Sequence, residues 1–181
     1  MTPTWQDILE IANQYSVNRI EYWLNEVLFS FSWWILLITT VSLLITWIII
    51  LDKTRKLEII SYGMMVAIIG NLGDMIGLSF SLWGYPHTLL HMPEILEIHN
   101  IMMPILYMVV YQYFRQWKTF FIAAAINAVF FAFILEPLII WLQIYELYKW
   151  KYIYSIVPYF VIAVVLKWII NKLKHTDQNN H

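Results

Sequence analysis

Cysteine is absent from this chain of 181 residues, and only 13% of the residues are charged. The absence of cysteine excludes disulfides, thiolate catalysis and metal sites with cysteine ligands. A formal net charge of −1 argues against a nucleic-acid partner, because the basic residues lie where membrane anchoring explains them. Residues 1–10 also lack the basic segment and apolar stretch of a cleavable signal peptide, so we expect insertion to begin with the first span.

Apolar residues are abundant, at 61% of the chain, which is more than a soluble domain of this size hides in its core. The stretch from Val27 to Leu51 contains no charged residue and exceeds the roughly 20 residues that cross the hydrocarbon core as a helix. Further spans are predicted at Leu57–Leu82, Leu96–Phe114, Thr119–Gln143 and Tyr152–Asn171. The sequence therefore predicts an all-α fold, a polytopic membrane bundle of about five transmembrane helices.

Lysine and arginine gather at alternating ends of these spans, and their distribution predicts the orientation. One side carries Lys53, Arg55, Lys56, Arg115, Lys118, Lys167, Lys172 and Lys174, and the other carries Arg19, Lys149 and Lys151. Cytoplasmic loops are enriched in basic residues, so the larger group is expected in the cytoplasm. Five spans then place the N-terminus outside and the C-terminus in the cytoplasm.

Three regions follow from this pattern. Residues 1–26 are predicted to form an extracytoplasmic amphipathic helical segment, because apolar residues recur there at i, i+3, i+4 and i+7. This segment is expected to cover the domain or to dock a partner. Residues 27–171 are predicted to form the five-helix transmembrane domain, and residues 172–181 a disordered cytoplasmic tail.

Ionisable and polar residues are predicted to lie at one depth in the outer leaflet. Asp74 and Glu136 each lie about 25 Å from the cytoplasmic start of their spans, at about 1.5 Å per helical residue. The same counting brings His99 and Asn100, and also Tyr154 and Ser155, to that level. Ionisable groups inside a span are costly, so such a layer is by default a hypothesis about function.

Helical spacing predicts which of these groups face one another. Asn71 and Asp74 share a face, as do Glu97 and Asn100, whereas Glu97 and His99 point to nearly opposite sides of their helix. Asn100 lies between them in angle, and we expect it to face inward. The predicted ligand-binding set is Asn71, Asp74, Glu97, His99, Asn100, Glu136, Tyr154 and Ser155.

Several functions fit a polar layer of this kind. The leading hypothesis is a pocket that binds a small ligand, a lipid headgroup or a partner helix. The second is a membrane enzyme that performs acid/base chemistry on a lipid or isoprenoid, with Asp74, His99 and Glu136 as catalytic candidates. A third is proton- or cation-coupled transport by an oligomer, and a purely structural polar cluster is the alternative to all three. Expected partners are membrane lipids, a small-molecule or lipid ligand, and a membrane-protein partner or second copy; no cofactor is required.

The outer loop from Trp83 to Pro93 is rich in turn residues and is predicted to form a structured cap or a re-entrant segment. His87, His91 and Glu94 have a spacing that would place two imidazoles and a carboxylate together on a helix. Pro93 interrupts such a helix, so loop histidines at the interface are the favoured interpretation and no metal is predicted.

Aromatic and glycine residues complete the pattern. The aromatic stretch from Trp141 to Tyr159 is typical of a belt at the outer membrane surface. Gly73 and Gly77 have the GxxxG spacing that lets two helices approach closely, here most simply within the same chain.

Short motifs occur along residues 57–160. They are Asn71-Leu-Gly-Asp74, Leu82-Trp-Gly-Tyr85, His99-Asn100 followed by Pro104, Glu136-Pro137 with Trp141, and the run from Tyr148 to Ser155. In these motifs the chain resembles a family of small multi-pass membrane proteins from bacilli and related spore-forming bacteria. The family has no assigned activity, so the resemblance implies a bacterial plasma membrane and supplies no catalytic residue.

Overall fold

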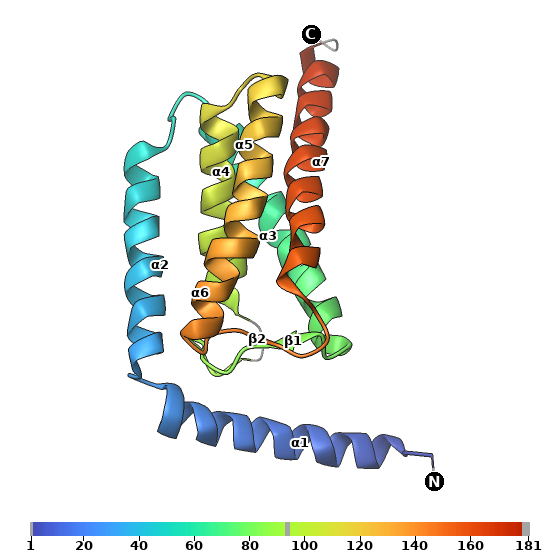
Figure 1. Cartoon of the computed structure of the whole chain (residues 1–181). Helices are drawn as coiled ribbons and strands as arrows, with labels where there is room; N and C mark the ends of the chain where they lie inside the picture. Colours follow the sequence, from blue (N-terminus) through green and yellow to red (C-terminus); the bar gives the residue numbers. More distant parts are fainter. Residues whose placement is uncertain (1, 93–94, 179–181) are drawn as a thin grey trace.

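The computed structural model describes residues 2–92 and 95–178, and the chain is mostly helical (Figure 1). The α-helices are α1 (Trp5–Tyr22), α2 (Phe31–Ile50), α3 (Lys56–Ser79), α4 (Met103–Tyr113), α5 (Trp117–Phe130), α6 (Glu136–Trp141) and α7 (Tyr152–Gln178). Wider π-helical turns form η1 (Trp23–Val27), η2 (Ile98–Met102) and η3 (Phe131–Leu135). The short strands β1 (Trp83–Gly84) and β2 (Glu146–Leu147) pair antiparallel. The predicted helical class is confirmed, and the strand pair is an addition to it.

Four helices within the described residues are long and apolar enough to cross a membrane: Phe31–Ile50, Lys56–Ser79, Trp117–Trp141 and Tyr152–Lys174. The third of these combines α5, η3 and α6 into one rod. These helices indicate an integral membrane protein. The span predicted at Leu96–Phe114 is not among them, because its regular part is only the short η2 and α4. The first predicted span is also shorter than expected, since the chain turns at Phe29 before α2 begins.

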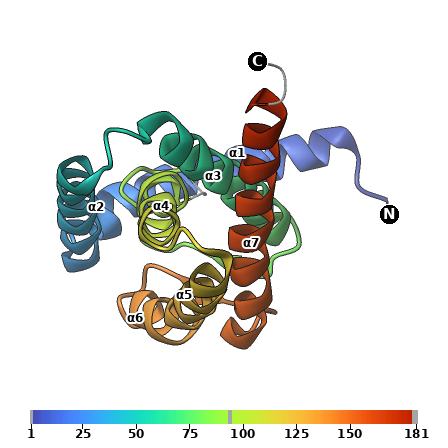
Figure 2. The same ribbon diagram turned by 90° about the horizontal axis from the view of Figure 1, so that it is seen from above.

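The helices α3, α4, α5 and α7 pack side by side, with α4 between α2, α3 and α5 when seen from above (Figures 1 and 2). We call the end with α1, β1 and β2 the cap end. The opposite end, with the α2–α3 turn, the α4–α5 turn and the C-terminus, is the basic end. Large apolar side chains such as Ile49 and Ile126 are exposed on the outer faces of the bundle, as expected of helices that face lipid.

Aromatic residues fill the core between α3, α4 and α7. The rings of Tyr62 and Tyr111 stack with centroids 4.3 Å apart, and both residues are buried. The Tyr62 hydroxyl donates to the backbone oxygen of Ala163, and the Tyr107 hydroxyl donates to that of Tyr159. The phenols of Tyr62 and Tyr107 therefore each have an acceptor on α7, which removes the penalty of burying an unpaired hydroxyl.

The helix α2 is fastened to its neighbours near both of its ends. At the cap end the Ser32 hydroxyl donates to the backbone oxygen of Leu142, at 2.5 Å. At the basic end the Gln112 side chain of α4 donates to the backbone oxygen of Ile50 and accepts from the backbone nitrogen of Asp52. Between these points α2 contacts η2 and α4. These hydrogen bonds fix both ends of a helix whose exposed surface is mainly apolar.

The N-terminal segment forms one helix that lies across the cap end, roughly perpendicular to the bundle (Figure 1). It begins with a capping box, in which the Thr4 hydroxyl accepts from the Asp7 backbone and the Asp7 carboxylate accepts from the Thr4 backbone. α1 continues without a break through Ser16. Every side chain of α1 is at least partly exposed. Arg19 of α1 and Trp23, the first residue of η1, donate hydrogen bonds to the loop after α3.

The loop after α3 folds back over the bundle as a structured cap, one of the two forms that its turn residues predicted. Arg19 donates to the backbone oxygens of Tyr85 and Met92, and the Trp23 indole donates to that of Thr88. The start of the loop is held from the chain after β2, because the backbone nitrogens of residues 148–150 donate to the backbone oxygen of Leu82. The last helix, α7, continues through residues 172–178, a stretch we expected in a disordered tail; residues 179–181 lie outside the described residues.

Candidate functional site

A cavity of about 310 Å³ lies at the cap end, between α3, η2, α6, α7 and the folded loops. Its polar lining comes from Asp74, His99, Glu136 and Ser155. Its aromatic lining comes from Trp83, Tyr85, Tyr145, Trp150 and Tyr159. The polar groups belong to four different predicted spans, so the expected shared depth of Asp74, His99, Glu136 and Ser155 corresponds to one cavity in the structure.

Asp74 is buried near the end of α3, and two ring donors hold one of its oxygens. The Trp83 indole nitrogen lies 2.9 Å from Oδ1, and the Tyr85 hydroxyl lies 2.6 Å from the same atom. The second oxygen, Oδ2, is buried and accepts no hydrogen bond from the described residues. Gly77 makes this arrangement possible, because a Cβ at that position would overlap the Trp83 ring.

His99 approaches Asp74 from η2. Its Nδ1 lies 3.8 Å from Oδ2 of Asp74, too far for a hydrogen bond but close enough for a charge interaction. Within the described residues, Nδ1 of His99 is also buried without a hydrogen-bond partner. Asp74 and His99 thus present two unsatisfied polar atoms to the same space.

Glu136 is the second buried carboxylate of the cavity. Tyr159 donates to its Oε1 at 2.8 Å, and the Ser155 hydroxyl lies near the same carboxylate. The other oxygen of Glu136, Oε2, is buried. No described residue donates a hydrogen bond to it with suitable distance and angle. Glu136 follows the π-turn η3 and precedes Pro137, whose missing N–H removes one bond from the helix ladder at this point.

Aromatic rings line much of the cavity beside the carboxylates. Tyr85 stacks on Tyr145 with centroids 5.4 Å apart, and Trp83 meets Trp150 edge to face, also at 5.4 Å. The Trp150 indole donates to the Ser155 hydroxyl at 3.0 Å. Burial, together with the nearby Asp74 carboxylate, raises the pKa of Tyr85 well above its ordinary value, so this phenol remains a donor. Burial likewise raises the pKa of Tyr145.

Four residues of the predicted ligand-binding set lie away from this cavity. Asn71 donates to Asn100 at 2.9 Å, and this pair joins α3 to η2 on an exposed side of the bundle. Glu97 is buried but accepts from the backbone nitrogen of Leu89, which anchors the cap. Tyr154 is exposed. The expectation that Asn100 faces inward is therefore wrong, and His99 occupies that place.

The π-turn η2 explains the error at Asn100. The expected direction assumed α-helical spacing, whereas residues Ile98–Met102 bond in a wider turn that advances by a smaller angle per residue. Pro104 lies just beyond this turn and cannot donate the next hydrogen bond of the ladder. The height of His99 could thus be counted from the sequence, but its direction could not.

The aromatic lining was missed because its residues come from loops and from a predicted interfacial belt. Trp141 and Tyr148 are exposed, as the belt requires, whereas Tyr145 is buried against the cavity. Trp83 and Tyr85 reach Asp74 because the cap folds back. The Leu82-Trp-Gly-Tyr85 motif was the available signal, since alternate aromatic residues beside a glycine indicate a close backbone approach.

The histidines of the cap do not gather with a carboxylate in the described part of the chain, where no group of three or more possible metal ligands is found. Nδ1 of His87 lies 2.7 Å from the backbone oxygen of Gln143, and the His91 ring lies against Trp23. Glu94, the third residue of the pattern, lies outside the described residues. In the part described, both histidines have structural contacts within the cap.

Compared with protein-family models, with curated proteins and with solved structures, the chain matches none of them.

Proposed function

We propose that this chain is an integral membrane protein whose cap-end cavity binds a small ligand with a positively charged nitrogen and an apolar body. One observation carries the proposal. Asp74 and Glu136 are both buried, each has one oxygen held by ring donors, and each has a second oxygen without a hydrogen bond among the described residues of the same cavity.

The energetics of burial favour a cationic ligand. A carboxylate away from water is costly unless a charge or several donors compensate it, and here one oxygen of each carboxylate lacks a hydrogen bond within the described residues. An ammonium group would interact with the remaining oxygens. The faces of Trp83, Tyr85 and Tyr145 would add cation–π attraction, which is strongest where water is excluded.

The size of the cavity limits the ligand. A volume of about 310 Å³ is at the lower end of the range for small-molecule pockets, and its lining is mainly apolar. A compact amine, or the ammonium headgroup of a lipid, meets these requirements. A partner helix could reach the site only with a single inserted side chain, so we favour the small ligand.

The location of the protein forms part of the proposal. With α4 and η2 counted as a fifth, shorter span, the basic residues of one end would face the cytoplasm and the cap would face outward. The resemblance to small multi-pass proteins of bacilli would place the chain in a bacterial plasma membrane. The cavity would then lie in the outer leaflet, where ligands could enter from lipid or from the surface.

The test uses the full chain in detergent or nanodiscs, with phenethylamine as the cationic probe and 2-phenylethanol as its neutral counterpart. Binding is measured as the rise in the midpoint of thermal unfolding. The amine should stabilise the protein more than the alcohol. Asp74→Asn and Glu136→Gln should each weaken amine binding by about 10- to 100-fold, the loss expected for a charged hydrogen bond.

Glu97→Gln is the matched control, because Glu97 is a buried carboxylate outside the cavity and its amide can still accept from Leu89. Amine binding should survive this change. Equal stabilisation by the amine and the alcohol, or equal losses in all three variants, would contradict the proposal.

Acid/base catalysis is the second candidate, and the approach of His99 to Asp74 favours it. A general acid or base must lie within hydrogen-bond reach of the reacting atom, and both side chains line the same cavity. A membrane lipid extract incubated with the protein should then yield a product visible by mass spectrometry. His99→Asn should abolish that product while the amine still binds. Absence of any product from the unaltered protein would reject catalysis and leave the binding proposal intact.

A further inference from the structure

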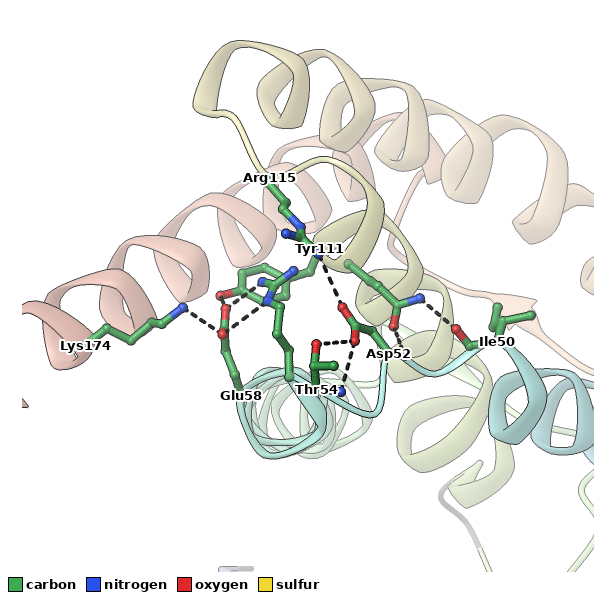
Figure 3. A network of polar contacts seen from close by, with 9 residues as sticks. Ile50, Asp52, Thr54, Glu58, Tyr111, Arg115 and Lys174 are labelled. Carbon is green, nitrogen blue, oxygen red and sulfur yellow. Dashed lines mark hydrogen bonds and ion pairs between the residues drawn. The ribbon is translucent and has the colours of Figure 1, made fainter.

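A second pocket, of about 250 Å³, lies at the basic end between the start of α3, the end of α4 and α7. Among the side chains that the structure describes, its lining includes four basic residues, Arg55, Arg115, Lys167 and Lys174, and one carboxylate, Glu58. Figure 3 shows that Glu58, Tyr111 and Lys174 converge from three different helices. This pocket lies at the opposite end of the bundle from the cap-end cavity.

Glu58 is already saturated by neighbouring donors. It accepts from the Tyr111 hydroxyl at 2.6 Å, from Lys174 at 2.7 Å, and from two nitrogens of Arg55 at 2.7 and 3.3 Å (Figure 3). The carboxylate therefore fixes the positions of two cations and has little remaining capacity for a third.

The cations around Glu58 retain unused donors. Nη1 of Arg55 is buried and makes no hydrogen bond within the described residues. The Arg115 side chain is 66% exposed and makes one contact, at 3.3 Å, with Asp52. Even with Asp52 counted, basic residues outnumber carboxylates among the described side chains of this pocket.

Lys167 adds a positive charge at the floor of the pocket. Its side chain is buried, and Nζ donates to the backbone oxygens of Phe114 and Arg115, at 2.9 Å each. It also lies 3.9 Å from the centre of the Phe120 ring. These contacts hold the ammonium group in place, but they supply partial charges only and leave its full charge to act on the pocket.

We propose that this pocket binds a phosphate group. Phosphate oxygens match both the forked donors of arginine and the point charge of lysine, and a phosphate would occupy the unused donor of Arg55. Basic pockets between membrane helices are suited to phosphorylated headgroups. The inference uses residues that the cap-end cavity does not contain, so it stands independently of the proposed function.

Two sources can provide this group: the headgroup of an anionic phospholipid and a free phosphate ion. The experiment separates them. The full chain is examined by native mass spectrometry in micelles with phosphatidylglycerol or phosphatidylcholine, and by thermal unfolding in inorganic phosphate or chloride at equal ionic strength. Preference for phosphatidylglycerol supports the lipid, and stabilisation by phosphate supports the free ion. Failure of both would overturn the proposal.

The double variant Arg115→Gln/Lys174→Gln tests the site itself. Each cation near a lipid phosphate is worth about fivefold in affinity, so the double variant should bind about 25-fold more weakly. Lys53→Gln/Lys118→Gln is the matched control, because it removes the same charge from the same end without altering the pocket lining. Equal losses in the two double variants would overturn the proposal, since they would indicate diffuse attraction.

A third variant distinguishes the loss of charge from a change in packing or folding. Arg115→Lys/Lys174→Arg preserves both charges and should retain binding at least within a few-fold of the unaltered chain. All variants are compared at equal helix content, measured by circular dichroism. Loss of binding in this charge-preserving variant as large as that in the glutamine variant would show that packing, and not charge, is responsible, and would also contradict the proposal.

Discussion

Nδ1 of His99 lies 3.8 Å from Oδ2 of Asp74, and in the described structure neither atom has a hydrogen-bond partner. The Oδ1 atom of the same carboxylate accepts from Trp83 and Tyr85. Asp74 is therefore the point at which α3, the cap and η2 meet. Its two oxygens have different surroundings, because the cap holds one and the cavity contains the other.

Tyr85→Phe should destabilise the protein by about 1 to 3 kcal/mol, because it removes a buried donor from a carboxylate. The Tyr85 side chain should keep its place, since its ring stacks on Tyr145. The free energy of unfolding in detergent, measured by denaturant titration, provides the check. Tyr145→Phe is the control, because that hydroxyl does not donate to Asp74; a loss as large in the control would mean that the effect does not come from the hydrogen bond to Asp74.

Gly77→Ala should displace Trp83 from Asp74, because the added Cβ would overlap the indole ring. Overpacking of this kind costs about 1 to 3 kcal/mol. Gly73→Ala is the control on the same helix, since a Cβ there meets no atom within 4 Å. Thermal unfolding should show a lowered midpoint for the first variant and little change for the second. The reverse order would disprove the contact between Gly77 and Trp83.

Arg19→Met should loosen the cap while keeping most of the side-chain bulk. It removes two hydrogen bonds from a charged donor to the backbone oxygens of Tyr85 and Met92, a loss of about 1.5 to 3 kcal/mol. Hydrogen–deuterium exchange should become faster in residues 85–92. Lys149→Met, which changes an exposed lysine at the same end, should leave that exchange unaltered. Unchanged exchange in the Arg19 variant would mean that the cap is held by its other contacts.

The first turn of α1 should unfold at acidic pH. Hydrogen bonds from the Thr4 side chain and backbone lower the pKa of Asp7 below its usual value of 3.8. Because the folded pKa is depressed, this stabilisation is fully present above pH 3.8 and is lost as the pH falls through the lower folded value. An NMR titration of the Asp7 carboxyl carbon should give a midpoint below 3.8. A midpoint at or above that value would contradict the capping box.

The depths of the site residues could be predicted from the sequence because a helix rises by a nearly constant distance per residue. Counting along separate spans placed Asp74, His99, Glu136 and Ser155 at one level, and they line one cavity. The direction in which each side chain points could be predicted less securely from the sequence. A single wider turn at Ile98–Met102 exchanged the places of His99 and Asn100.

The cap could be predicted only as a structured loop. The contact of Trp83 and Tyr85 with Asp74 depends on a pairing of residues 83–84 with residues 146–147, and local sequence contains no information on that register. The same reason explains why Tyr145 was assigned to the membrane surface. Its neighbours Trp141 and Tyr148 are exposed, and only the tertiary fold directs Tyr145 inward.

The double attachment of α2 has a consequence for bilayers of different thickness. A helix without such attachments can respond to a thinner membrane by tilting independently of its neighbours, at a modest free-energy cost per ångström of mismatch. Ser32 and Gln112 join α2 to its neighbours near opposite ends, so this helix cannot change its inclination without breaking one of the two attachments. The entire bundle must then tilt as one body. The cap-end cavity and the pocket at the basic end would shift together.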